Sequence, residues 1–140
     1  MMDRSVAVAR ITETENLTSD LTDADAQWVI DWGVAQLDVL VLGSRDEASA
    51  GYKLNQLMAV MRALGSIGGT YAERPPTLLI GDLRGFFARY ALAFGQPNRV
   101  READLAPLAA RIVPLAPQAV LQVLLATAAG PAPQGEANHG

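Results

Sequence analysis

The sequence predicts an all-α protein, a compact antiparallel bundle of about five helices. Three observations lead to this class: apolar residues recur at helical spacing, capping residues precede them, and glycines or prolines follow them. Residues 20–129 are expected to form this helical domain. An N-terminal arm or edge strand is expected at 1–19 and a disordered tail at 130–140.

The first predicted helix covers about Asp23–Leu42. Thr22 can accept a hydrogen bond from an early helix amide, and Asp23 suits the positive end of the helix dipole. Gly43 is expected to end the helix. The apolar residues between these signals follow helical spacing; they are Trp28, Val29, Trp32, Leu37, Leu40 and Val41.

A second helix is predicted at about Asp46–Leu64, directly after the first. Ser44 and Glu47 have the spacing of a capping box, and Gly65 is expected to end the helix. Because the link between the two helices is short, they should form an antiparallel hairpin. The core residues of the second helix recur at i, i+4 and i+7; they are Ala50, Leu54, Leu57, Met58, Met61 and Leu64.

The third predicted helix begins near Leu78 and ends before Gly95, and it has two different faces. One face carries Leu83 and the aromatic residues Phe86, Phe87, Tyr90 and Phe94. The second face consists of small residues that would let another helix approach closely; they are Gly81, Gly85, Ala88 and Ala91. A short helix from Asp104 and a last helix at Gln118–Ala129 complete the bundle, with Pro114 and Pro117 between them.

An α/β fold is the alternative, with strands near 6–11, 39–42 and 77–81. Its ligands would sit near Ser44 and Asp82, because parallel strands bind ligands beyond their carboxyl ends. The all-α interpretation is preferred because the apolar residues of the first predicted helix keep their helical spacing through Leu40, inside the proposed strand at 39–42. Gly33 is a weak separator of helix from strand, since one internal glycine costs a helix only about 1 kcal/mol.

The composition excludes several kinds of chemistry. The chain has no Cys, and its one His, His139, is in an Ala/Pro/Gly-rich tail. This argues against thiol chemistry, Cys/His metal sites and histidine acid–base catalysis, so no cofactor or metal is expected. The net charge of −4 argues against nucleic acid, and no run approaches the ~20 apolar residues of a membrane span. A cytoplasmic and, from the excess of Arg over Lys, bacterial protein is expected.

Two groups of residues are candidates for ligand binding. Arginines interleaved with aromatic residues can bind phosphates or other anions; this segment contains Arg84, Arg89, Arg99 and Arg101. An amphipathic helix with an arginine rim explains the same pattern and is preferred, because the whole chain is acidic. A small ligand could also lie between helices near Trp28, Trp32 and Tyr52.

The last predicted helix is a candidate subunit interface. It has no charged residue and is apolar on nearly every side, so it must be covered on most sides. Because a small bundle does not easily provide that cover, we expect Leu121, Leu124 and Leu125 to lie between the subunits of a homo-oligomer.

The chain contains neither a Gly-x-Ser-x-Gly nor a Ser-x-x-Lys motif, and no other catalytic set is evident. The first hypothesis is therefore a non-enzymatic helical protein-interaction or scaffold domain that forms a homodimer. The second is a small-molecule-binding module with a pocket between helices. The third is a small α/β enzyme with its site near Ser44 and Asp82. An enclosed pocket would favour the second hypothesis, and a parallel sheet would favour the third.

Overall fold

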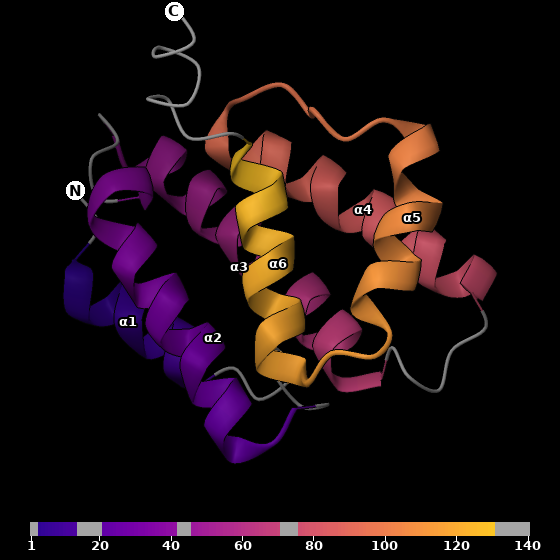
Figure 1. Ribbon diagram of the computed structural model, residues 1–140. Coiled ribbons are helices and arrows are strands. Elements are labelled where there is room, and N and C mark those ends of the chain that lie inside the picture. The colour runs from indigo at the N-terminus through magenta and orange to yellow at the C-terminus, as the bar shows by residue number, and fades with distance from the viewer. Residues whose placement is uncertain (1–2, 14–20, 42–45, 71–75, 131–140) are drawn as a thin grey trace, which may run out of the picture.

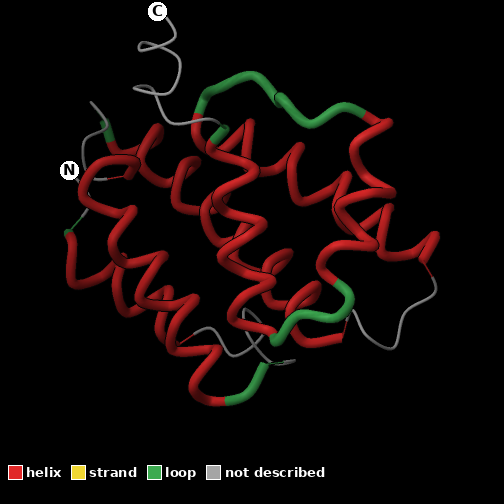
Figure 2. The backbone as a smooth tube through the Cα atoms, in the orientation of Figure 1, coloured by secondary structure: helices red, strands yellow, loops and turns green. Residues whose placement is uncertain are grey.

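The computed structural model of this chain describes residues 3–13, 21–41, 46–70 and 76–130. Within these ranges the chain is helix and loop, with no strand, so the predicted all-α bundle is confirmed (Figure 1 and Figure 2). The elements are α1 (Arg4–Glu13), α2 (Asp23–Gln36), the π-helical segment η2 (Leu37–Val41), α3 (Glu47–Thr70), α4 (Pro76–Phe94), α5 (Glu102–Ile112) and α6 (Pro117–Ala129).

The α/β alternative is wrong at each of its three proposed strands. Residues 6–11 lie inside α1, residues 39–41 belong to η2, and residues 77–81 form the first turns of α4. The physical reason is that the apolar side chains of these segments reach the core at helical spacing, as Leu79 and Leu83 do in α4. Residue 42 lies outside the described residues.

The N-terminal segment differs from the expected arm or edge strand, because residues 4–13 form helix α1. Ala7 and Ile11 are one helical turn apart and are both fully buried in the core. The Arg4 Nε atom donates a hydrogen bond to the Asp38 Oδ1 atom at 3.0 Å, which joins α1 to η2. The sequence at 6–11 shows a weak strand-like alternation, so the helical i, i+4 spacing of Ala7 and Ile11 was not recognised. The tail expected to be disordered lies, from residue 131, outside the described residues.

Helix caps fix where α2 and α3 begin. The Asp25 amide donates to the Thr22 Oγ1 atom at 3.3 Å, as predicted for the start of α2. At the start of α3 the cap is Asp46, whose Oδ1 atom accepts from the Ser49 amide at 2.8 Å. This backbone hydrogen bond lowers the pKa of the Asp46 carboxyl. Ser44, the cap that the sequence predicted, lies outside the described residues.

Helix α3 continues past Gly65, which the sequence predicted as its end, to Thr70. The reason is close packing on the inner side of the helix. A Cβ atom at Gly68 would lie 2.9 Å from Leu121 Cδ2 and 3.3 Å from Leu21 Cδ2, so glycine lets α6 approach α3. Gly33 in α2 has the same role, because a Cβ atom there would lie 2.5 Å from the Met61 Sδ atom.

Helix α6 lies across the middle of the bundle and packs against α2, α3 and α4 (Figure 1). Leu121 and Leu124 are 0% exposed in the single chain, and Leu125 is half-buried. Two of the three leucines expected at a subunit interface, Leu121 and Leu124, are therefore part of the chain's own core. The exposed positions of α6 are polar or small, such as Gln122 and Ala126. The bundle thus covers most of this apolar helix without a partner.

Candidate functional site

The inner face of α4 anchors this helix in the core through aromatic residues. The Phe86 and Phe87 rings meet edge to face at 5.0 Å, and the Tyr90 and Phe94 rings stack at 4.3 Å between centroids. The Trp32 ring of α2 contacts the Phe94 ring at 6.1 Å. Burial raises the pKa of the Tyr90 phenol. These contacts fix the rotation of α4, so its opposite face is turned outward.

The three aromatic residues predicted to line a ligand pocket, Trp28, Trp32 and Tyr52, do not come together in one pocket. Trp32 belongs to the aromatic contacts just described, and Trp28 packs half-buried against the core. Tyr52 is on α3 and is largely exposed. None of the three lines the α3–α4 groove or the α5–α6 groove described below.

The four candidate arginines have different surroundings. Arg84 binds Glu102 of α5 with two hydrogen bonds, one of them from Nε to Oε1 at 3.0 Å. This contact lowers the pKa of the Glu102 carboxyl. Arg101 pairs with Asp104, Nη2 to Oδ1 at 3.2 Å. Neither pair was predictable from the arginine segment alone, because both acids belong to the next helix, α5.

The third of these arginines, Arg99, lies against Gly130 and lines the groove between α5 and α6. This α5–α6 groove consists of two adjoining hollows of about 740 and 360 Å³ that share Arg111, Thr127 and Gly130. Its polar lining residues include Arg99, Asp104 and Gln122.

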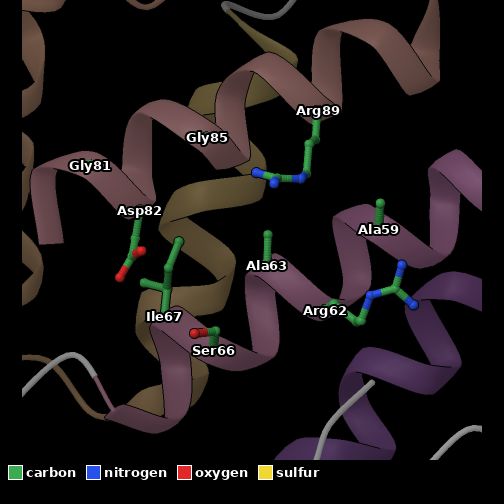
Figure 3. A pocket seen from close by; sticks show the side chains of 9 residues that line it. All are labelled: Ala59, Arg62, Ala63, Ser66, Ile67, Gly81, Asp82, Gly85 and Arg89. Carbon is green, nitrogen blue, oxygen red and sulfur yellow. The ribbon is translucent and has the colours of Figure 1, made fainter. Parts of the chain in front are cut away.

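The fourth candidate, Arg89, lines a different groove between α3 and α4, of about 560 Å³. Figure 3 shows Arg89 and Arg62 toward one end of this α3–α4 groove and Asp82 and Ser66 toward the other. The groove is also lined by four alanine or glycine residues; they are Ala59, Ala63, Gly81 and Gly85. The Arg89 guanidinium turns back over Gly85, since its Nη1 atom would lie 2.7 Å from a Cβ atom there.

One side of this groove is continuous with an outward surface of α4 that we call the α4 outer face. It consists of Leu78, Gly81, Gly85, Ala88, Leu92 and, directly after the helix, Gly95. These residues follow the a and d positions of a heptad repeat, which place them in one stripe along a helix. Leu78 is 57% exposed and Leu92 is 56% exposed. No described residue comes within 4 Å of a Cβ atom built on Gly81 or Gly95.

Charged residues flank the α4 outer face. Asp82 and Arg89 occupy the e positions of the same heptads, on the side of α3, and Arg84 occupies a g position on the side of α5. The small residues of this surface were predicted from the sequence, whereas its exposed leucines were not. The signal was present in the spacing of Leu78 and Leu92 from Gly85, one heptad on each side.

The described residues contain neither a cluster of His, Cys, Asp or Glu that could hold a metal ion nor a buried side-chain nitrogen or oxygen without a hydrogen-bond partner. Asp82, proposed for the site of an α/β enzyme, stands in the second turn of α4 and not at the end of a strand. No helix in the described part of the chain is long and apolar enough to cross a membrane.

Comparisons of this chain with protein-family models, with curated proteins and with solved structures found no match.

Proposed function

We propose that this protein is a non-enzymatic helical interaction domain that forms a homodimer through the α4 outer face. The observation that carries the proposal is the pair of leucines, Leu78 and Leu92, each more than half exposed on one stripe of one helix. The two leucines are about four helical turns apart. The exposed residues between them on the stripe, Gly81 and Ala88, have no polar side chain, so the stripe differs from the scattered exposed apolar residues that are ordinary on a protein surface.

The glycines of this stripe support the same proposal through their energetic cost. An internal glycine destabilises a helix by about 0.5–1 kcal/mol relative to alanine, because it loses more conformational entropy. At Gly33 and Gly68 close packing within the chain offsets that cost. At Gly81 nothing in the described chain does, so a closely packed partner helix is the natural compensation. Gly51 in α3 is also open, but no exposed leucine shares its helix, because Leu54, Leu57 and Leu64 are all buried.

A second copy of the chain is the occupant that the charge pattern fits. Asp82 and Arg89 lie on the same flank, the acid toward the beginning of α4 and the base toward its end. A second α4 running in the opposite direction therefore presents a base where the first presents an acid. Such charges beside an apolar seam select the partner and its orientation.

Light scattering on three proteins tests the proposal. The wild type should have the mass of a dimer, and Leu92→Lys should be a monomer with unchanged helicity, because Leu92 is on the surface of the single chain. Val113→Lys is the matched control: Val113 is also about half exposed, at 48%, but lies at the end of α5. It should remain a dimer. A wild type that stays monomeric at high concentration rejects the proposal, as does a dimer that tolerates Leu92→Lys.

A small anionic ligand in the α3–α4 groove is a second candidate function. Arg62 and Arg89 both line this groove, and neither forms an ion pair with another described residue. Guanidinium groups bind phosphate and carboxylate through paired hydrogen bonds. Inorganic phosphate should then raise the melting temperature of the wild type more than that of the Arg62→Gln, Arg89→Gln double variant. Equal response of the two proteins would reject this site.

A further inference from the structure

We infer that the two copies pair their α4 helices antiparallel, with Leu92 of each copy over Gly81 of the other and a two-fold axis between Gly85 and Ala88. This inference rests on the proposed function, because it specifies how the proposed homodimer is built. It follows from three properties of the α4 outer face: the order of large and small residues, the positions of the flanking charges, and the space above the glycines.

The order of large and small residues fixes the register. In an antiparallel pair the a positions of one helix lie level with the d positions of the other. If Leu92 lies level with the partner's Gly81, then Gly85 lies level with the partner's Ala88, and Leu78 lies level with the partner's Gly95. Each leucine thus meets a glycine, and the centre of the contact holds only glycine and alanine. Large residues that face small ones let two helices interdigitate at a short interaxial distance.

The space above the glycines is consistent with this register. A Cβ atom on Gly81 or on Gly95 would have no described neighbour within 4 Å, so both positions can receive a leucine side chain from a partner. Gly85 is covered by the Arg89 guanidinium, which is at the far end of an exposed, flexible side chain. When the helices meet, this group must move off Gly85.

The flanking charges fix the antiparallel direction. In an antiparallel pair the e positions of the two helices face each other. Once the Arg89 guanidinium has moved off Gly85, it can therefore contact Asp82 of the second copy. The two-fold axis produces the same contact a second time. Asp82 need not be unpaired in its own chain, because a carboxylate can accept several hydrogen bonds. A parallel pair would instead place Arg84 beside the partner's Arg89, where like charges repel.

Single-cysteine variants test direction and register, because the natural chain has no Cys that could interfere. An equimolar mixture of Gly81→Cys and Leu92→Cys should form a disulfide-linked dimer under mild oxidation. Neither variant alone should form a crosslinked dimer. In the antiparallel pair the two copies of residue 81, or of residue 92, are about 16 Å apart along the helix axis. A disulfide spans at most about 7 Å between Cα atoms. Gly81→Cys mixed with Val113→Cys is the control that should stay unlinked.

Each outcome of this experiment has one meaning. Crosslinking of Gly81→Cys by itself would show a parallel pair and overturn the inference. If no mixture crosslinks while light scattering still shows a dimer, the proposed homodimer stands and this register is wrong. If light scattering shows only monomers, the proposed function itself fails.

A charge exchange gives an independent measurement of the same pairing. Arg89→Asp alone should raise the dimer dissociation constant by about threefold to tenfold, as expected for exposed ion pairs turned into like-charge pairs. Adding Asp82→Arg to Arg89→Asp should restore most of the affinity, because the exchanged charges again face each other. Failure of the double variant to recover, with its fold intact by circular dichroism, would contradict the antiparallel pairing.

Discussion

Glycines on α3 and on α4 have opposite surroundings, although the sequence presents them in the same way. Gly68 of α3 faces inward, and the Leu121 side chain of α6 occupies the space where its side chain would be. Gly81 of α4 faces outward, with no described atom in that space. Both interrupt a helix of good apolar periodicity. The comparison shows that a helical glycine in a sequence of good apolar periodicity can be packed closely inside the chain, as Gly68 is, or can face open space, as Gly81 does.

The first prediction tests the packing of α6 against α3, where the Leu121 side chain occupies the space next to Gly68. Leu124→Glu should unfold the chain or destabilise it by more than about 3 kcal/mol, because it removes a buried leucine and buries a carboxylate. Urea denaturation followed by circular dichroism measures this loss. A stable, folded monomer carrying Leu124→Glu would show instead that α6 is an interface between subunits.

The second prediction concerns Gly68 itself. Gly68→Ala should destabilise the fold by about 1–3 kcal/mol, because the added methyl group overlaps the side chains of Leu121 and Leu21 and forces them to move. The midpoint of urea denaturation should fall. An unchanged midpoint would mean that α6 is not held as closely to α3 as the structure shows.

The third prediction is the matched change on α4 and has the opposite sign. Gly81→Ala should stabilise the single chain by about 0.5–1 kcal/mol, because alanine is the better helix former and its methyl group meets nothing in the chain. The comparison is made in the Leu92→Lys background, so that dimerisation does not contribute. Destabilisation there would reveal a close neighbour of Gly81 within the chain.

The fourth prediction concerns the inner face of the same helix and is the smallest effect. The folded pKa of Tyr90 is raised by burial, so its contribution to stability is present below the unfolded pKa of about 10 and is lost as pH rises through and above that value. The melting temperature of the wild type should therefore decline more steeply above about pH 10 than that of Tyr90→Phe. Parallel pH profiles of the two proteins would contradict the burial of this phenol.

The sequence was sufficient for the features that depend on neighbours along one helix. Helical spacing and the cap at Thr22 predicted the class and the beginning of α2, and Pro117 marked the start of α6 closely. It was insufficient where two helices meet. Gly65 was predicted as a helix end, yet α3 continues past it to Thr70, and the glycine at 68 is explained only by the position of α6.

The candidate site was predictable only where it depends on residue spacing along one helix. The small residues of α4 were visible from their spacing, whereas the pairing of Arg84 with Glu102 depends on how α5 returns along α4. Leu121 and Leu124 were assigned to an interface because an apolar helix alone does not reveal which elements cover it. Exposed leucines lie instead on α4, whose aromatic side is held in the core and whose Leu78 and Leu92 are turned outward.

Sedimentation equilibrium of the wild type beside Gly81→Leu tests the central claim most directly. In the single chain the added leucine enters open space, so the variant should fold at least as well as the wild type. In the dimer it would collide with the partner's Leu92. We therefore expect a dimer for the wild type and a folded monomer for Gly81→Leu. A wild type that sediments as a monomer, or a Gly81→Leu variant that dimerises as tightly as the wild type, would contradict the assignment of the α4 outer face as the surface of self-association.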